Sequence, residues 1–423
     1  MGLTMRPLRL ICRPLIMGLL LCSGPALSAV QIQFWTMQLS PFHDEYVNGL
    51  IERFEADHPD IRVKWVDVPW KEMEKKMLAS VAARTAPDVV NLNPQFSSKL
   101  ASYGALADPE DYLTQSQVNR FLPAIWKANR YHGQTFAIPW YLSTTITIYN
   151  RQMMQQADVS VPETHEGILE AAKTIKKKLG KYTYFPAMDG SKPLEDLVTS
   201  GAKLVNDSQT AAGFNTGQGR EFFELYRQLY QQELIPKNVL TEGHHKAVDL
   251  FQSGQLAMIS TGMQFLNTIK INAPDLYQQI DVAPQLGAQS GRFNVAAMNL
   301  AVPMLSRHKH AAFEFAAFVT NAENQMALAK RVPLLPSTKA SYQSDFFQPK
   351  DSQAPKSLFE KARYVSAEQV LEGHVLVPPL PKYSKLRNSF VRNLQSAMVG
   401  KLSVDEAVQQ AADTWALFLG DRS

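Results

Sequence analysis

Two kinds of side chain in this sequence could hold a polar organic molecule, and most of them follow candidate strands. Flat aromatic rings stack on the C–H face of a ligand, each contributing on the order of 1 kcal/mol beyond burial. Amides, hydroxyls, imidazoles and carboxylates form directional hydrogen bonds that reject a ligand lacking the matching group. The candidate aromatic residues are Trp35, Trp140, Tyr141, Tyr184 and Tyr383, and the polar ones are Gln38, His43, Asp44, Asn93, Gln95, Ser143, Asp189, Gln264 and Asn299.

Gly262 and Met263 complete this candidate ligand-binding set, because they follow the apolar run that ends at Thr261. A glycine directly after a buried strand lets backbone N–H groups approach a ligand. A plain turn from strand to helix explains the same residues, and both interpretations can hold at once.

Other candidates also have a structural interpretation. Core packing competes with ligand contact for each aromatic residue, including Trp35 and Trp140 at expected strand ends. His43 and Asp44 could cap a helix, and Asn93 before Pro94 could open the next one.

The signatures of the common hydrolases are missing from the chain. There is no Gly-x-Ser-x-Gly elbow, no His-Glu-x-x-His and no phosphate-binding Gly-x-x-x-x-Gly-Lys-Ser/Thr. Ser200 and Ser306 fit only a four-residue Ser-x-x-Lys pattern that arises by chance, and no spacing pairs two carboxylates. His244-His245 predicts a solvated loop rather than a metal site. The sequence therefore implies neither an enzyme nor a cofactor.

Strands and helices alternate in the first third of the chain. Residues 30–35 and 61–66 alternate polar and apolar side chains, 88–92 is an apolar run, and helical spacing covers 46–54 and 70–83. This order predicts a mostly parallel sheet with helices on both faces, which binds ligands at the carboxyl ends of its strands. Because Pro139 has no backbone donor, we expect the sheet to be interrupted there as the chain leaves one domain for another.

The first 28 residues predict a cleaved secretory leader, with arginines before a short apolar run and small residues at Ala26 and Ser28. Lipid attachment at Cys22 is the alternative, although Leu21 before it is bulky. Both cysteines, Cys12 and Cys22, lie in this leader. The net charge of +4 falls to about +1 without the leader arginines, which argues against a nucleic-acid partner.

Several segments, taken in order, resemble a known family. They are Phe34-Trp35, Phe54-Glu55-Ala56-Asp57-His58-Pro59, Pro87-Asp88-Val89-Val90, Gly133-Gln134, Ile138-Pro139 and Ile148-Tyr149-Asn150, followed by 248–262, 280–284, 294–303 and 311–323. The ordered set is similar to the carbohydrate-type solute-binding proteins of ATP-driven importers, which include the maltose-binding and glycerol-phosphate-binding proteins. It covers essentially the whole chain after the leader.

This resemblance implies a two-lobed α/β fold, with two mostly parallel sheets flanked by helices and a ligand cleft between the lobes. Lobe 1 is expected at 29–140 and 286–332, and lobe 2 at 141–285 and 333–423. The chain would cross between them near 139–144, 283–287 and 331–336. The implied protein is a monomeric, non-enzymatic receptor, periplasmic or on the cell surface. It closes on its solute and docks on two membrane permease subunits, which a cytoplasmic ATPase drives.

The chain also departs from its maltose-binding relatives. Ser143 stands where they place a carboxylate, and Asn93 and Gln95 replace a tryptophan-and-aspartate arrangement. A cleft short of acids and rich in amides and hydroxyls argues against maltodextrins. It predicts a neutral, hydroxyl-rich solute, such as a sugar, a small oligosaccharide, a glycosylated polyol or a polyol. An exported hydrolase of glycosides or amides is the alternative, and a metal- or anion-binding receptor on the same fold is a third hypothesis.

Overall fold

The computed structural model describes residues 1–2, 29–287, 291–349 and 354–420, so the predicted leader lies outside the described residues except for its first two. The strands are β1 Val30–Met37, β2 Ile61–Val68, β3 Val89–Leu92, β4 Arg130–Tyr131, β5 Gln134–Thr135, β6 Ile138–Thr144, β7 Ile146–Asn150, β8 Met258–Thr261, β9 Ile280–Ala283, β10 Val295–Ala301 and β11 Leu335–Pro336. The α-helices are α1 Asp44–Asp57, α2 Trp70–Ala82, α3 Pro94–Ser102, α4 Gln115–Val118, α5 Pro123–Ala128, α6 Arg151–Ala157, α7 His165–Leu179, α8 Lys192–Thr199, α9 Gly217–Gln231, α10 His244–Gln252, α11 Phe265–Asn272, α12 Pro274–Tyr277, α13 Lys309–Val319, α14 Ala322–Ala329, α15 Leu358–Leu371, α16 Tyr383–Met398 and α17 Val404–Gly420. Short 3-10 helices span Pro109–Asp111, Lys237–Leu240 and Lys339–Gln343.

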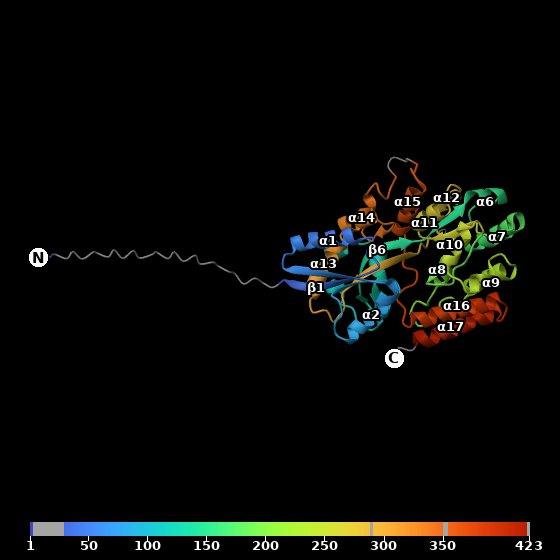
Figure 1. The fold of residues 1–423 in the computed structure, drawn as a ribbon. Coiled ribbons are helices and arrows are strands. Elements are labelled where there is room, and N and C mark those ends of the chain that lie inside the picture. Colours follow the sequence, from blue (N-terminus) through green and yellow to red (C-terminus); the bar gives the residue numbers. More distant parts are fainter. Residues whose placement is uncertain (3–28, 288–290, 350–353, 421–423) are drawn as a thin grey trace.

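A six-stranded sheet in the order β11-β6-β10-β3-β1-β2 forms the centre of the first lobe (Figure 1). β1 pairs in parallel with β2 and β3, as the alternation of strands and helices predicts. β10 is antiparallel to both β3 and β6, because it returns from the second lobe and enters the sheet from the opposite end. The sheet is therefore mixed, and only its β3-β1-β2 part is parallel.

β6 runs through Pro139 without a break. Pro139 lies opposite Asn299, and the register of β10 shifts between Met298 and Asn299 at this point. An irregularity of this kind lets a strand tolerate a residue that lacks an N–H donor. The expected interruption of the sheet is therefore wrong, and Trp140 and Tyr141 lie inside a strand rather than in a hinge.

The second lobe contains a three-stranded sheet in the order β8-β7-β9. β7 leads away from the first lobe, whereas β8 and β9 lead back toward it, so both are antiparallel to β7. The expectation that this sheet is mostly parallel is wrong. The two-lobed α/β architecture itself is the predicted one (Figure 1).

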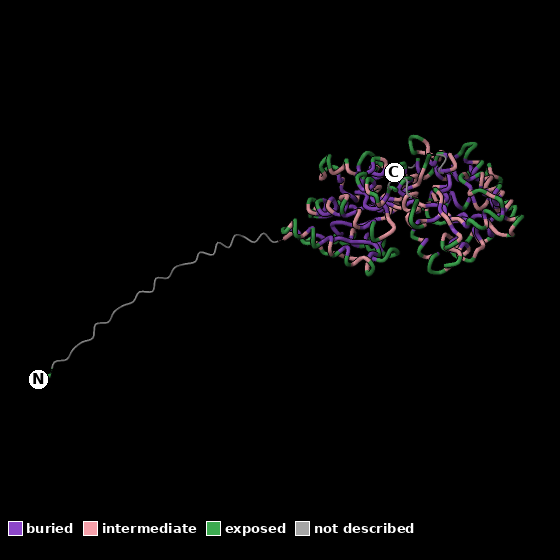
Figure 2. The backbone as a smooth tube through the Cα atoms, turned by 90° about the horizontal axis from the view of Figure 1, so that it is seen from above, coloured by how far each residue is buried: buried purple, intermediate pink, exposed green. Residues whose placement is uncertain are grey.

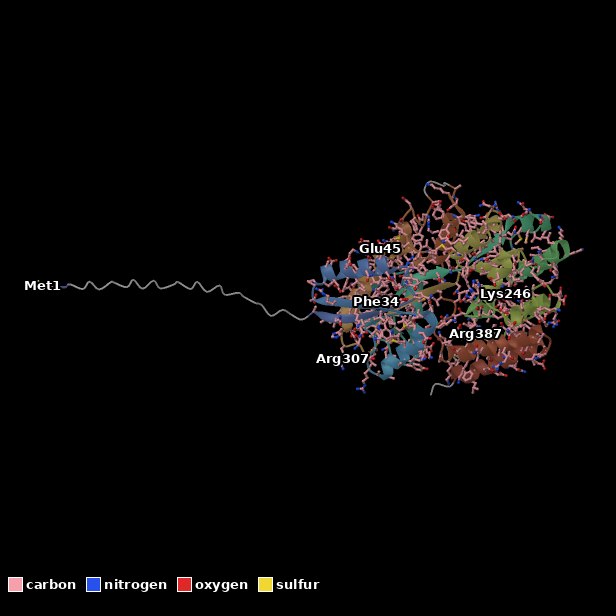
Figure 3. All side chains as sticks on the ribbon, in the orientation of Figure 1. Met1, Phe34, Glu45, Lys246, Arg307 and Arg387 are labelled. Carbon is pink, nitrogen blue, oxygen red and sulfur yellow. The ribbon has the colours of Figure 1, made fainter. Side chains whose placement is uncertain are left out.

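Each lobe has its own aromatic core, seen as buried backbone inside each half of Figure 2. In the first lobe the ring of Phe315 lies edge-on to Phe34 and Phe54, with centroids 5.1 and 5.0 Å apart. Figure 3 labels Phe34 within this lobe. In the second lobe Phe214 lies edge-on to Phe390 and Trp415, at 5.2 and 5.1 Å. Two separately packed cores suit lobes that move as rigid bodies.

The chain changes sheet between Thr144 and Ile146, and again between Ala283 and Val295. β6 therefore carries residues 141–144 in the first sheet, and β11 adds Leu335 and Pro336 to its edge. The expected lobe boundaries had placed both segments in lobe 2. The first connection between the sheets is therefore at residues 144–146, at the end of β6.

Candidate functional site

A cavity of about 320 Å³ opens in the second lobe. Its lining is Thr145, Tyr184, Phe185, Ala187, Asp189, Gly190, Ser191, Lys192, Glu195, His244, Ala247, Ser260, Thr261, Gly262, Gln264 and Phe265. Four of the predicted site residues lie together here, namely Tyr184, Asp189, Gly262 and Gln264, and Met263 is buried beside them. The volume and the mixture of apolar walls with a few polar groups are typical of sites for small organic ligands.

The turn from β8 to α11 places Gln264 in this cavity. Gly262 permits this arrangement, because a Cβ atom there would lie 2.2 Å from the Gln264 side-chain oxygen Oε1. The group that lies close to the backbone of Gly262 is therefore the side-chain amide of Gln264. The exposed Gln264 side chain is held over the backbone at the end of a buried strand.

A second turn positions Asp189 at the N-terminus of α10. Asp189 Oδ1 accepts a hydrogen bond of 3.1 Å from the backbone N–H of His244. A Cβ atom on Gly243 would lie 2.5 Å from Asp189 Oδ2, so the contact needs a glycine there. A carboxylate at this end of a helix is stabilised by the helix dipole.

His244 belongs to the wall of the cavity. Its Nε2 lies 3.0 Å from Thr261 Oγ1, and burial lowers the pKa of His244, although Asp189 opposes the shift. His244 is the first residue of α10. The expectation of a solvated loop at His244-His245 is therefore wrong for His244, because its ring packs against Phe265, which also lines the cavity.

The first turn of α8 adds charged groups to the cavity wall. Lys192 forms an ion pair with Asp196, whose side chain is only 1% exposed. Burial favours the neutral amine, but Asp196 raises the pKa of Lys192 above its ordinary value. Burial also raises the pKa of Glu195, which accepts a hydrogen bond from Ser191 Oγ. The cavity thus contains two acids and a paired cation, and the expected shortage of acids is wrong.

Arg387 of α16, labelled in Figure 3, fixes the loop that leads into this wall. Its guanidinium donates to the backbone carbonyls of Met188 and Gly190, at 2.8 Å for the latter. The loop carries Asp189, so a helix near the C-terminus orients a carboxylate of the cavity.

A narrower cavity, of about 20 Å³, lies between the lobes. It brings Gln95 of the first lobe together with Tyr383 at the start of α16. Burial raises the pKa of Tyr383 to about 12, and the negative charge of Glu195 contributes. These two predicted residues therefore lie on opposite sides of the gap between the lobes, close to the acid of the larger cavity.

The predicted residues that follow β1 lie apart from the second-lobe cavity, whose lining comes from residues 145–265 alone. Trp35 is 6% exposed, donates to Gln33 Oε1 and lies under Lys76 Nζ at 4.6 Å. Gln38 is exposed and has a positive φ of 54°. His43 stands at the N-cap of α1 without a side-chain cap bond, and Asp44 begins the helix.

The remaining first-lobe candidates mostly form internal contacts. Asn93 Oδ1 caps α3 by accepting from Phe96 N, the alternative role noted above. Tyr141 lies 3.5 Å from Asn91 Oδ1, and Trp140 is fully buried against Phe34. Ser143 is half-buried in β6.

Asn299 is the most fully bonded of the first-lobe candidates. Its Nδ2 donates to Ser97 Oγ at 3.2 Å, and its Oδ1 accepts from Asn129 Nδ2 at 2.7 Å. Both ends of this buried amide are therefore satisfied inside the lobe.

The serines of the two Ser-x-x-Lys patterns also bond within the protein. Ser306 Oγ donates to Asp88 at 2.6 Å, and Ser200 Oγ donates to the Leu197 carbonyl at 2.8 Å. Across the described residues there is no group of three or more His, Cys, Asp or Glu side chains arranged to hold a metal ion. Nor does the described part of the chain contain a helix long and apolar enough to cross a membrane.

Comparison with known proteins defines the class of this fold and site. Residues 43–326 match the model of the bacterial extracellular solute-binding protein family. A solved structure from Synechococcus sp. MITs9220, provisionally assigned as an oligosaccharide periplasmic-binding protein, is 35% identical, with a TM-score of 0.83 over 92% of this chain and 99% of that one. The mannitol-binding protein of Pseudomonas aeruginosa is 22% identical, over 86% of this chain and 87% of its own. The galactooligosaccharide-binding protein of Bacillus subtilis is 21% identical, over 96% and 95%.

The chain belongs to the bacterial extracellular solute-binding protein family. It is the substrate-binding component of an importer of the ATP-driven class, as the order of its segments predicts, and it is not a hydrolase. Most residues that line the cavity were not among the predicted ligand contacts, including Phe185, Ser191, Lys192, Glu195, His244 and Ser260. The sequence does contain one local signal for this part of the wall. The segment Gly190-Ser191-Lys192-Pro193 is typical of the start of a helix.

Proposed function

We propose that this protein binds a neutral, hydroxyl-rich solute, a sugar, small oligosaccharide, glycosylated polyol or polyol, in the second-lobe cavity. The main support for this proposal is the set of residues that line the cavity. Tyr184 supplies an aromatic ring, while Gln264 and Asp189 supply groups that hydrogen-bond hydroxyls. Lys192, the cation of the wall, is already paired with Asp196, which disfavours an anionic ligand. The names of the mannitol- and galactooligosaccharide-binding relatives support the same class.

Closure of the lobes completes the site in this proposal. The larger cavity is lined by residues of one lobe alone, so the other lobe can add contacts only when the lobes approach each other. Rotation about residues 144–146 and 283–287 would bring Gln38, Asn93 and Gln95 toward the solute. The solute then favours the closed state by its differential affinity for it.

The rest of the proposal concerns the place of the protein in the cell. The leader at 1–28 directs export, so the mature chain works as a monomer in the periplasm or, if lipid is attached at Cys22, on the cell surface. The closed form docks on two permease subunits in the membrane, and the cytoplasmic ATPase acts on it only through them. No cofactor takes part.

A thermal-shift screen of the mature chain, residues 29–423, tests the solute class. Monosaccharides, disaccharides, polyols, glycosylated polyols, phosphates and zinc are each added, and mass spectrometry follows the solute. Zinc is included because the Synechococcus protein has also been solved with it. A ligand at 100 times its Kd adds about 2.7 kcal/mol of stability. We expect one neutral solute to stabilise the protein and to be recovered intact.

The matched control is Gln264→Ala, which should weaken that shift without changing the melting temperature of the ligand-free protein. Stabilisation by phosphate or by zinc alone would overturn the proposed solute class. Cleavage of the stabilising solute would contradict its role as a receptor.

A further inference from the structure

The first turn of α8 places an ammonium group and a carboxyl group side by side on the wall of the second-lobe cavity. Lys192 and Glu195 lie three positions apart, so they are neighbours on one face of the helix. Both residues line the cavity. Their hydrogen bonds go to other partners, because Lys192 donates to Asp196 whereas Glu195 accepts from Ser191 Oγ. The wall therefore offers a donor and an acceptor at adjacent places.

Lys192 can donate further hydrogen bonds. An ammonium group carries three N–H donors, and the bond to Asp196 Oδ1 uses one of them. The Lys192 side chain is 19% exposed and lines the cavity, whereas Asp196 is 1% exposed and does not. Because the charge of Lys192 is already balanced, its remaining donors suit the oxygen of a neutral hydroxyl group.

Tyr226 of α9 holds Asp196 through its other carboxylate oxygen. The Tyr226 hydroxyl donates to Asp196 Oδ2 at 3.3 Å, so the two oxygens of Asp196 bond separately to Tyr226 and Lys192. Burial and the negative charge of Asp196 raise the pKa of Tyr226, which keeps its hydroxyl protonated as a donor. Tyr226 is 2% exposed, and its ring packs against Phe222 with centroids 4.6 Å apart. A chain of hydrogen bonds thus runs from the core of the lobe to the cavity wall.

α8 itself is fixed at both ends. The carbonyl of Gly190, just before the helix, accepts from Arg387 at 2.8 Å. Thr199, its last residue, has its Oγ1 atom 2.9 Å from His165 Nε2 of α7. Groups that are supported in this way keep their orientation before a ligand arrives, which discrimination between similar solutes requires.

We propose that Tyr226 is a positioning residue that holds the Lys192 ammonium, through Asp196, where it donates to one hydroxyl of the solute, while Glu195 accepts from the neighbouring hydroxyl. Two adjacent hydroxyls meet both groups of the wall, so the cavity selects a vicinal diol. A solute that lacks one of the two leaves a polar group of the wall unpaired and is rejected. The inference rests on the proposed solute class.

The first test uses the ligand-free mature chain, so it does not depend on the solute. The proton–nitrogen NMR signal of the Lys192 ammonium reports on the support that Asp196 gives, and Lys192→Arg assigns this signal by its loss. We expect Tyr226→Phe to shift or broaden the signal, because Asp196 then lacks one of its two partners. Tyr46→Phe is the matched control. Tyr46 is 4% exposed and donates to the Asn324 carbonyl at 3.0 Å in the first lobe, so its loss should leave the Lys192 signal unchanged.

The second test is calorimetric titration with glucose, galactose, mannitol and sucrose, each beside its monodeoxy forms. For a probe that binds, we expect Tyr226→Phe to weaken the affinity by roughly two- to tenfold, the range that the net contribution of one hydrogen bond gives. Tyr46→Phe should leave the affinity unchanged. One monodeoxy form should bind the parent more weakly by a similar factor and should be insensitive to Tyr226→Phe, because it lacks the hydroxyl that Lys192 contacts.

Both tyrosine variants lose one buried hydrogen bond and should have lowered melting temperatures, so stability alone does not decide the matter. An unchanged Lys192 signal in Tyr226→Phe would overturn the proposal. So would an unchanged affinity in that variant, or an equal loss of affinity in Tyr46→Phe, because the role of Tyr226 would then be structural. A parent that binds none of the probes counts against the proposed solute class alone, and the ligand-free signal still decides whether Tyr226 positions Lys192.

Discussion

In the first lobe Asn299 uses both ends of its amide on neighbours inside the sheet, whereas in the second lobe the amide of Gln264 lies over a glycine at the edge of a cavity. Asn299 lies within the apolar strand β10 and Gln264 follows the strand β8, and both have side chains able to bind hydroxyl groups. The difference lies in what surrounds them. The Asn299 amide finds protein partners inside the first lobe, while the Gln264 side chain is exposed and lines the cavity. The lobe that lines the cavity therefore holds the groups open to solute.

The charged residues of the two lobes differ in the same way. Asp196 is buried, and its partner Lys192 is half-buried in the cavity wall. Glu110 of the first lobe lies at the surface and pairs with Arg130. Burying an ion pair costs desolvation energy that only good geometry offsets. Loss of one member of such a pair should therefore cost more stability than loss of a surface ion pair.

The largest effect is expected for Lys192→Met. It leaves the Asp196 carboxylate, 1% exposed, without its cation, and should lower the free energy of unfolding by about 3–5 kcal/mol. Urea unfolding at pH 7 measures the change. The control is Lys173→Met, which removes an exposed pair with Glu170 and should change stability by less than about 1 kcal/mol. Equal effects of the two substitutions would contradict the importance of burial here.

Asn299→Ala and Gln264→Ala test the contrast between the two amides. Asn299→Ala leaves buried partners on Asn129 and Ser97 unsatisfied, and should lower the free energy of unfolding by about 1–3 kcal/mol. Gln264→Ala removes an exposed side chain and should change stability by about 0.5 kcal/mol or less. In calorimetric titration with the solute found by the screen, the order should reverse, with Gln264→Ala the more damaging. If Asn299→Ala weakened binding more than Gln264→Ala, the first-lobe amide would be a ligand contact after all.

Periodicity in the sequence was enough to order the elements, since helices and strands appear where residues 30–35, 46–54, 61–66 and 70–83 predict them. It could not give the direction of β10, which depends on a return from the second lobe, or the shift at Met298 that lets Pro139 remain in a strand. Of the residues that the sequence suggests as ligand contacts, Tyr184, Asp189 and Gln264 line the second-lobe cavity. Lys192 and Asp196 show the i,i+4 spacing of a helical ion pair, but their burial comes from packing that no local pattern encodes.

The pKa values of Glu195 and Glu110 shift in opposite directions, which predicts opposite dependences of stability on pH. Burial raises the pKa of Glu195, so the folded state binds more protons and stability falls as the pH rises from about 4.5 through the folded pKa. Bonds from Arg130 and Thr135 lower the pKa of Glu110 to about 2, so its contribution is present above about pH 4.5 and is lost between pH 4.5 and 2.

Melting temperatures measured from pH 3 to pH 8 separate these two contributions. Glu195→Gln should flatten the decline on the alkaline side, while Glu110→Gln should weaken the loss on the acid side. Since Glu110 is partly exposed, solvent screening makes its effect the smaller of the two. Identical pH profiles for the two variants would show that burial does not distinguish these carboxyl groups.

The smallest effect is expected for Trp140→Phe. The indole Nε1 of Trp140 is buried without a hydrogen-bond partner, and the ring packs against Phe34 and Tyr141. Phenylalanine removes the unsatisfied N–H but leaves a small void, so the two changes oppose each other and stability should change by about 1 kcal/mol or less. Affinity for the solute should stay within about twofold, because Trp140 is 0% exposed and does not line the second-lobe cavity. A loss of about tenfold or more would return Trp140 to the ligand site that the sequence predicts, and would require the first lobe to rearrange when it closes.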